Sequence, residues 1–184
     1  MQRRKDRDAN GAYFTPTETI LDFLAVQDVL DPSMSVWEPA CGSGNISKAL
    51  ISKGYNVFSS DLYNYGYGMT GVDFLKVSKK FDVIITNPPY SLAEQFIERS
   101  LEHASIVVML LRLSFLEGQG RARGLWKHHP PHRVYICGRR PSMYKVNHIG
   151  KKNGGFVAYA WYVWKKESTE SRLEWIIDTG VKHK

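Results

Sequence analysis

The segment Phe81-Asp82-Val83-Ile84-Ile85-Thr86-Asn87-Pro88-Pro89-Tyr90 joins a short apolar run, rich in β-branched residues, to a pair of prolines. Such a run is typical of a central strand in a parallel sheet, buried on both faces. Each proline fixes φ near about −65° and lacks an N–H, and the first also pushes Asn87 toward extended backbone. The sequence therefore predicts a buried strand that ends at Asn87 and continues into a rigid turn.

This turn would leave two oxygen atoms free to accept hydrogen bonds, the backbone carbonyl of Pro88 and the side-chain carbonyl of Asn87, beside the flat ring of Tyr90. Two acceptors and an aromatic face suit a planar group with an amino function, such as the edge of adenine or cytosine. The lone pair of such an amine is delocalised, so the amine is a poor nucleophile. Accepting both of its hydrogens stabilises the positive charge that develops as it attacks an electrophile. The alternative is that the four residues only form a strand-ending turn.

Residues 35–44 run from a strand-like start into Gly42-Ser43-Gly44, and a helical pattern of apolar residues follows. Glycines permit a tight turn and let a ligand approach the N-terminus of the helix. The third glycine of a dinucleotide fingerprint is missing, which argues against a nicotinamide site. Asp61 follows the next apolar segment, where an acid typically holds ribose hydroxyls. Asp73-Phe74 combines an acceptor with an aromatic ring, which suits adenine. Each acid alone would be a solvated loop carboxylate, but the order of the motifs favours a site.

On these residues the chain resembles the S-adenosylmethionine-dependent amino-methyltransferases of DNA, especially the adenine-N6 branch with the Asn-Pro-Pro-Tyr motif. The resemblance runs from Tyr13 to Trp164 and is carried by residues 13–16, 38–44 and 87–90. It implies a class I, Rossmann-like methyltransferase that transfers a methyl group from S-adenosylmethionine to the N6 amine of adenine in DNA. The implied catalytic residues are Asn87, Pro88, Pro89 and Tyr90. The implied cofactor residues are Tyr13, Thr15, Glu38, Ala40, Gly42, Asp61, Asp73, Phe74 and Asn87. Of these, Thr15, Glu38 and Ala40 would contact methionine, Asp61 the ribose, and Asp73 with Phe74 the adenine.

Charge is spread unevenly along the chain. Residues 1–100 hold 10 Lys and Arg against 12 Asp and Glu, whereas residues 101–184 hold 15 against 6. Basic residues that neutralise phosphates give salt-sensitive affinity that depends little on sequence. A solvated basic face is the alternative, but the excess follows a base-handling motif, so DNA is the expected partner and RNA the second choice. The expected contacts are Arg121, Arg123, Lys127, Arg139, Arg140, Tyr144, Lys145, Lys151 and Lys152. Tyr144 or Met143 would cover the second face of a flipped base.

The remaining pattern predicts an α/β fold with a doubly wound, mostly parallel sheet and a C-terminal antiparallel hairpin strand. Thr15 is expected to cap a helix that has Pro16 in its first turn and Glu18 closing a capping box. A second helix is expected over residues 92–103, and strands over 106–111, 134–137 and 156–164. Residues 145–155 are expected to form a mobile loop. The tail, 167–184, is polar, with a short helix expected around Trp175.

At 184 residues, we expect a single methyltransferase domain with a flexible N-terminus over residues 1–12. No segment is long and apolar enough for a membrane span or a secretory signal, so a cytoplasmic location is expected. Cys41 and Cys137 are expected to be reduced thiols, and the six histidines show no metal spacing. Only 94 residues follow Tyr90, so we expect a compact, phage-type enzyme without a separate target-recognition domain and with short or lax sequence preference.

Several alternatives remain open at the level of the sequence. The same nucleophile problem arises for cytosine N4, for an amine in RNA and for a glutamine amide in a protein. The basic second half argues against a protein substrate. A module that binds the cofactor and nucleic acid without catalysis is a different class of function, and the intact Asn87 and Tyr90 argue against it.

Overall fold

The computed structural model describes residues 13–145, 155–177 and 179. The expected flexible N-terminus, Lys151, Lys152 and nearly all of the expected mobile loop lie outside these residues. Within the described part of the chain, every helix falls well short of the roughly 20 apolar residues that a membrane span requires.

A seven-stranded sheet organises the fold, in the order β3-β2-β4-β5-β8-β6-β9. All neighbouring strands are parallel except β8, which is antiparallel to both of its neighbours. The mostly parallel sheet with one antiparallel strand in the C-terminal part of the chain, β8, is therefore confirmed. The strands are β2 (Ser35–Glu38), β3 (Asn56–Ser59), β4 (Phe81–Thr86), β5 (Ala104–Arg112), β6 (Arg133–Cys137), β8 (Tyr159–Lys165) and β9 (Arg172–Ile176).

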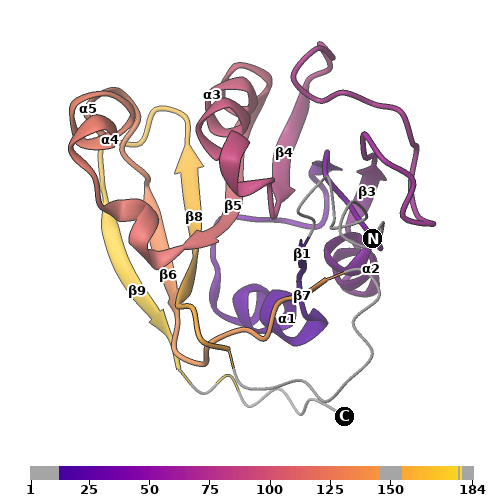
Figure 1. Ribbon diagram of the computed structural model, residues 1–184, viewed down its shortest axis with the longest axis horizontal. Helices are drawn as coiled ribbons and strands as arrows, with labels where there is room; N and C mark the ends of the chain where they lie inside the picture. The colour runs from indigo at the N-terminus through magenta and orange to yellow at the C-terminus, as the bar shows by residue number, and fades with distance from the viewer. Residues whose placement is uncertain (1–12, 146–154, 178, 180–184) are drawn as a thin grey trace, which may run out of the picture.

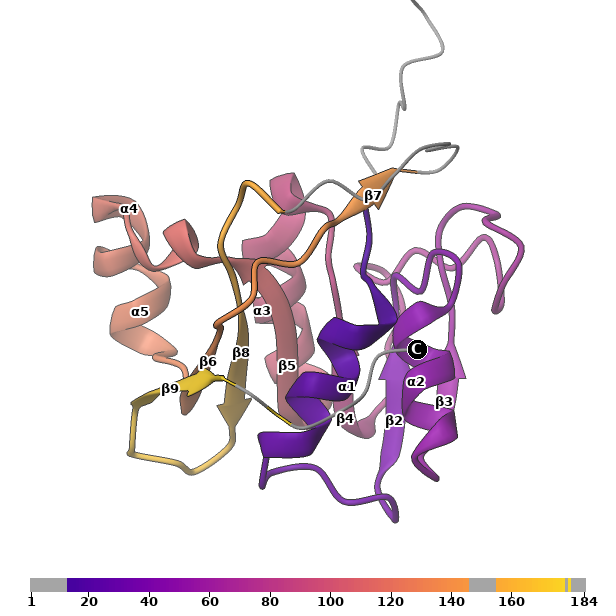
Figure 2. The ribbon, with the colours of Figure 1, turned by 90° about the horizontal axis from the view of Figure 1, so that it is seen from below.

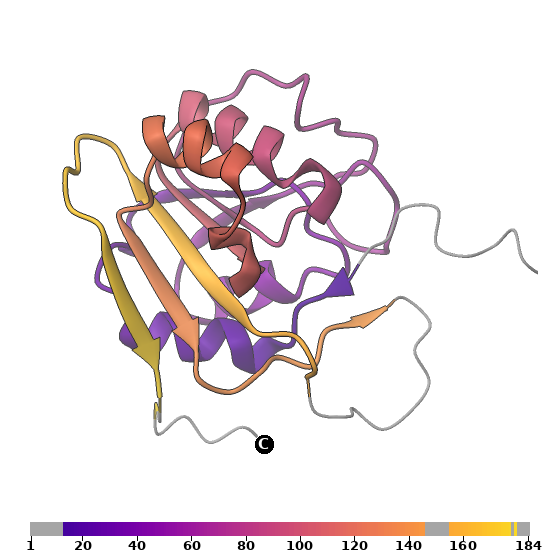
Figure 3. The ribbon, with the colours of Figure 1, turned by 60° about the vertical axis from the view of Figure 1, so that its left-hand side comes forward.

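Helices cover both faces of this sheet (Figures 1 and 3). On one face lie α1 (Thr17–Val26) and α2 (Asn45–Ser52). On the other face lie α3 (Ala93–His103), α4 (Gln119–Arg123) and α5 (Leu125–His128). Two single turns of 3₁₀ helix, η1 (Tyr90–Leu92) and η2 (Leu113–Leu116), follow β4 and β5. The three layers give the sheet two buried faces.

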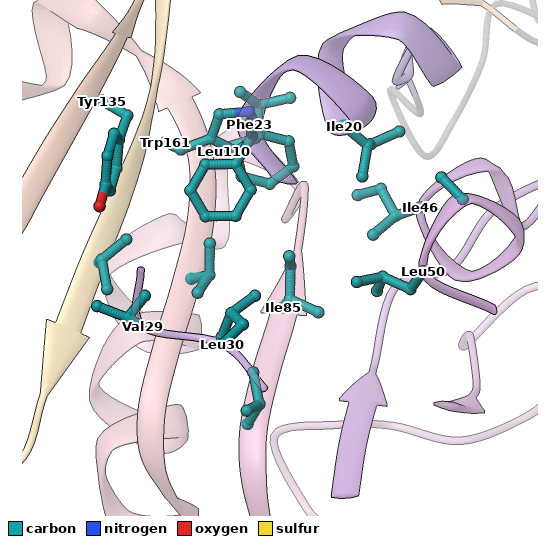
Figure 4. Packing of buried hydrophobic residues seen from close by; sticks show 14 of the residues in the cluster. Ile20, Phe23, Val29, Leu30, Ile46, Leu50, Ile85, Leu110, Tyr135 and Trp161 are labelled. Atoms are coloured by element: carbon teal, nitrogen blue, oxygen red, sulfur yellow. The ribbon is translucent and has the colours of Figure 1, made fainter. Parts of the chain in front are cut away.

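Strand β4 is central, as its apolar run predicts, because it pairs in parallel with β2 and β5. Val83 and Ile85 pack in the core cluster on the α1 side, whereas Ile84 packs in the cluster on the α3 side. Successive side chains of a strand point to opposite faces, so both faces require apolar residues. Figure 4 shows Ile85 in the α1-side core, near Leu110 from β5.

Two sequence-based expectations about local structure are wrong. Helix α1 begins at Thr17 with Pro16 in extended backbone as its N-cap and no capping side chain, so Thr15 does not cap it. The tail forms strand β9 rather than a helix, paired in parallel with β6. Ile176 is buried on the α1 side, while Trp175 is 60% exposed. Alternation between a buried and an exposed residue has the two-residue period of a β-strand.

The chain changes direction in the sheet next to β2, because β3 lies on one side of β2 and β4 on the other. Ligands of such sheets bind at the carboxyl ends of the strands at this switch point. A small two-stranded sheet lies beside it, formed by β1 (Tyr13–Phe14) and β7 (Tyr144–Lys145), which run antiparallel. Figure 1 labels these two short strands next to each other, and Figure 2 shows β7 above the indigo segment that leads into α1.

Candidate active site

A cavity of about 270 Å³ lies at this switch point. Its walls come from β1, from the turn after β2, from the loops after β3 and from the turn after β4. Every residue expected from the sequence to be catalytic or to bind the cofactor lines this cavity. They are Tyr13, Thr15, Glu38, Ala40, Gly42, Asp61, Asp73, Phe74, Asn87, Pro88, Pro89 and Tyr90. The fold thus brings together residues from five separate segments of the chain.

The turn after β2 requires its glycines. Gly42 has φ of +52° and Gly44 has φ of +80°, in the left-handed region that side chains rarely adopt. A Cβ at Gly42 would lie 2.6 Å from the ring of Phe14, and one at Gly44 would lie 2.3 Å from the ring of Tyr67. The backbone of this turn therefore lies directly against the aromatic residues around the cavity.

Two buried carboxylates hold the cavity walls in place. Asp61 accepts hydrogen bonds from the N–H groups of Gly42 and Tyr63, both at 2.9 Å, and burial raises its pKa. Glu38 accepts a hydrogen bond from the N–H of Ser47 at 2.8 Å and another from its hydroxyl. Burial is the main cause that raises the pKa of Glu38 to about 8. Glu38 thus connects β2 to the first turn of α2.

The Asn87 amide has a fixed orientation. Its Nδ2 donates to the backbone carbonyl of Tyr13 at 3.0 Å, and its buried Oδ1 has no hydrogen-bond partner in residues 13–145, 155–177 and 179. Buried polar atoms are nearly always paired, so an unpaired one needs an explanation. Within the described residues, no backbone N–H donates to the carbonyl of Pro88. The two acceptors expected from the sequence are therefore both available in the wall of the cavity.

The hydroxyl of Thr15 is a second buried, unpaired polar atom in the cavity wall. Capping of α1 was the structural explanation for Thr15, and the helix start at Thr17 removes it. Asn45, which also lines the cavity, donates to the Thr15 carbonyl at 2.7 Å and to the Tyr144 hydroxyl at 2.5 Å. The backbone of Thr15 is thereby held while its side-chain oxygen stays unsatisfied.

Tyr90 is held by three neighbours. Its hydroxyl shares a hydrogen bond of 2.9 Å with the hydroxyl of Tyr159, and burial with this bond raises its pKa. The Tyr13 ring is stacked with it, with centroids 6.1 Å apart and planes inclined by 26°. The guanidinium carbon of Arg112 lies 4.8 Å from its ring centroid. Tyr159 is the direct β8 partner of Arg112 in the sheet.

Asp73 and Phe74 lie on the wall that leads to α3. Phe74 is only 3% exposed and packs against Trp37 and Phe96, with centroids 5.1 and 4.8 Å away. Asp73 accepts from the N–H of Leu75 at 3.2 Å and forms an ion pair of 3.0 Å with Lys76. These contacts fix the loop that closes this side of the cavity.

The expected nucleic-acid residues do not gather in one place. Arg121 lies over the ring of Phe115 and donates to two backbone carbonyls, with a weak ion pair to Glu94 at 3.4 Å. Arg123 and Lys127 are exposed on α4 and α5. Arg139 and Arg140 line a separate groove of about 650 Å³ between the start of α1 and the end of β6.

Tyr144 and Met143, the two residues expected to cover the second face of a base, make different contacts in the structure. Tyr144 contacts the ring of Phe14 and the amide of Asn45, both on the wall of the cavity. Met143 packs against the core cluster on the α1 side. Lys145 lies in β7, beside Tyr13.

The sequence interpretation missed several residues at this site, Asn45 among them. Leu62, Tyr63 and Tyr65 line the cavity on the loop after Asp61. A run with three tyrosines and two glycines, residues 62–68, was the available signal. Arg112 and Tyr159 reach Tyr90 only through the pairing of β5 with β8, which no local pattern reveals. Among the described residues, no group of three or more His, Cys, Asp or Glu side chains could hold a metal ion.

No protein-family model matches the sequence, and a search of curated proteins gives no match either. Solved structures match over most of the chain at low identity. A proposed RNA methyltransferase of Pyrococcus horikoshii gives a TM-score of 0.61 at 15% identity, over 85% of this chain and 87% of that one. The methyltransferase subunit of a type I restriction-modification system from Streptococcus thermophilus gives a TM-score of 0.59 at 15% identity. The match covers 85% of this chain and 45% of the subunit.

A third match is magnesium protoporphyrin IX methyltransferase from Synechocystis, with a TM-score of 0.55 at 16% identity. Its crystal structure contains bound S-adenosylmethionine. The match covers 82% of this chain and 79% of that one. At such identities a match establishes the fold alone. The chain has the Rossmann-like fold of class I S-adenosylmethionine-dependent methyltransferases.

Proposed function

We propose that this protein transfers a methyl group from S-adenosylmethionine to the exocyclic N6 amine of adenine in DNA. The observation that carries the proposal is the buried, unpaired Oδ1 of Asn87, which lies beside Tyr90 in the wall of the cavity. An acceptor held in this way, without a partner among the residues that the structure describes, matches the need of an amine that must be made nucleophilic.

The residues around the cavity fit S-adenosylmethionine. The turn at Gly42 and Gly44 brings backbone to the N-terminus of α2, and the Thr15 hydroxyl is unpaired at the cavity wall. Buried Glu38 and Asp61 can accept from an ammonium group and from ribose hydroxyls. Phe74 and Leu62 offer apolar surface for the adenine ring. Glu38 would hold the methionine part, together with Thr15.

S-adenosylmethionine, held by Thr15, Glu38 and Asp61, would supply the electrophilic methyl group for the amine, with its sulfur leaving as a neutral thioether. Asn87 Oδ1 and the Pro88 carbonyl each accept one hydrogen of the amine. This draws the nitrogen toward tetrahedral geometry and stabilises the positive charge that it gains in the transition state. The methylated nitrogen then loses one proton to water, which restores a neutral amine. The Tyr13 carbonyl holds the Asn87 amide with Oδ1 as the acceptor throughout.

The choice of DNA is supported by charge and by the neighbours in structure. Residues 101–184 carry 15 Lys and Arg against 6 Asp and Glu, which suits a phosphate backbone. The type I restriction-modification subunit is a neighbour that belongs to a DNA-modifying system, and the proposed RNA methyltransferase keeps RNA as the second candidate. A base within a duplex would have to be flipped out to reach Asn87.

The experiment is a methyl-transfer assay with radiolabelled S-adenosylmethionine and separate DNA, RNA and protein substrates, followed by digestion of the product to nucleosides. We expect label in N6-methyladenine from DNA. Label in another product would identify the alternative substrate, and no label in any of them would refute the proposal.

The matched variant is Asn87→Ala. We expect it to abolish methyl transfer while cofactor affinity, measured by calorimetry, stays close to that of the wild type. The reason is that the lost acceptor acts mainly in the transition state. An Asn87→Ala protein with full activity would rule out the mechanism.

A further inference from the structure

A second groove, of about 490 Å³, adjoins the cofactor cavity at Tyr90. Tyr90 and Ser91 line both spaces, so the two are joined at the catalytic turn. This second groove is lined by η1, by α3, by the end of β5, by η2 and by Arg121 of α4. Its volume falls within the range of small-molecule sites, about 300–1,000 Å³.

Arg112 is the distinctive residue of this groove. It is the last residue of β5, its side chain is exposed, and its guanidinium lies over the ring of Tyr90. Within the described part of the chain, this contact with Tyr90 is the one interaction of its side chain, with no carboxylate paired to it. The nearby Arg121 differs, because it already contacts Phe115, Glu94 and backbone carbonyls.

The Arg112 guanidinium occupies space that a flipped base would need. Aromatic rings stack with centroids roughly 4.5–7 Å apart, and the guanidinium carbon already lies 4.8 Å from the Tyr90 centroid. A base can therefore stack on this face only after Arg112 moves. Guanidinium groups bind phosphate through two parallel hydrogen bonds, and they also stack on aromatic rings. The Arg112 side chain can therefore stack on the Tyr90 ring in the free protein and bind a phosphate in the complex.

We propose that Arg112 is a positioning residue for the target nucleotide: its guanidinium leaves the face of Tyr90 when a base stacks there, and it then binds a phosphate of the same nucleotide. This assignment rests on the proposed function and gives it a specific substrate contact. Gln95 and Ser114, which also line the groove, have side chains that can bond the edges of a neighbouring base. Tyr159 keeps the Tyr90 ring in place through their shared hydrogen bond while Arg112 moves.

The test uses a fluorescein-labelled single strand of oligodeoxyadenylate, because a single strand needs no duplex opening. Binding is measured by anisotropy between about 50 and 200 mM salt, and methyl transfer is measured with radiolabelled S-adenosylmethionine. The variants are Arg112→Ala and Arg112→Lys, and the matched control is Arg172→Ala. Arg172 is exposed, lies at the start of β9 at the opposite edge of the sheet from Asn87, and pairs with Glu170.

For Arg112→Ala we expect kcat/KM to fall by about tenfold to a hundredfold, as for loss of a hydrogen bond to a charged group. The slope of log affinity against log salt should decrease by about 0.7, the value for one phosphate contact on a single strand. Calorimetric affinity for S-adenosylmethionine should stay unchanged, which separates this role from a defect in folding. Arg112→Lys should recover the salt slope but not the rate, because lysine keeps the charge without the planar fork. Arg172→Ala should match the wild type in every measurement.

Two results would overturn the assignment while leaving the proposed function intact. One is a wild-type rate and salt slope in Arg112→Ala, and the other is a wild-type rate in Arg112→Lys. A wild-type protein that methylates RNA or protein but not DNA would refute the proposed substrate, and the role of Arg112 with it. Wild-type protein that neither binds nor methylates the strand would also overturn both.

Discussion

Glu38 carries the clearest prediction about stability. Its carboxyl group is 1% exposed, accepts two hydrogen bonds from Ser47 and lies near Asp61. Burial raises its pKa from 4.5 to about 8. The change that isolates this carboxyl group is Glu38→Gln, because the amide has nearly the same shape and can still accept from Ser47 but does not ionise.

The direction in which stability changes with pH follows from whether the folded or the unfolded chain holds the Glu38 proton. Below about pH 4.5 Glu38 is protonated in the folded and the unfolded chain, so its titration does not reduce stability. Between about pH 4.5 and 8 the unfolded chain has released this proton and the folded chain still holds it, so stability falls as the pH rises. Each pKa unit corresponds to about 1.4 kcal/mol. The contribution lost above pH 8 is therefore at most about 5 kcal/mol.

The assay is urea denaturation of the cofactor-free protein across this pH range. We expect the free energy of unfolding of Glu38→Gln, relative to the wild type, to rise by several kcal/mol from acidic to alkaline pH. Glu98→Gln removes an exposed carboxyl group on α3 and should show no such trend. A difference between wild type and Glu38→Gln that stays constant with pH would refute the reasoning.

Other changes test the cofactor cavity. Gly44→Ala places a Cβ 2.3 Å from the ring of Tyr67 at φ of +80°, so we expect lower stability in urea and weaker cofactor binding. Gly54→Ala is the control: φ is +88° with no atom within 4 Å, so it should show only the strain of about 1–2 kcal/mol. Equal losses of stability and of cofactor affinity in Gly44→Ala and Gly54→Ala would contradict the steric argument. Asp61→Ala removes the acceptor that holds Gly42 and should weaken cofactor binding by about 1.5–3 kcal/mol in calorimetry. Unchanged affinity would exclude Asp61 from the ribose site.

The sequence predicted those parts of the fold that depend on local pattern. Strand β4 carries apolar residues on both faces, and glycines precede α2, so both could be placed from the chain alone. The sequence also indicated which residues come together at the cavity, because the carboxyl ends of neighbouring parallel strands meet at one edge of a sheet. The start of α1 was misplaced because Pro16, in extended backbone, replaced the expected capping by Thr15.

The remaining features depend on contacts between distant segments. Leu173, Trp175, Ile176 and Ile177 are spaced ambiguously, and pairing with β6 selected the strand. Tyr144 contacts the cavity-lining residues Phe14 and Asn45 because β7 pairs with β1. Arg112 and Tyr159 met Tyr90 because of the register between β5 and β8. Such contacts follow from strand register, which single residues do not encode.

The pairing of β1 with β7 has a consequence for synthesis of the chain. Phe14 pairs with Tyr144, 130 positions later, and the β1 carbonyl of Tyr13 fixes the Asn87 amide. Closing so long a loop costs conformational entropy that local contacts cannot offset early. Chains are made from the N-terminus, so Tyr13 leaves the ribosome long before its partner strand exists. The nascent chain must therefore reach at least residue 145 before β1 can pair with β7, the strand that lies beside the Tyr13 segment whose carbonyl holds the Asn87 amide.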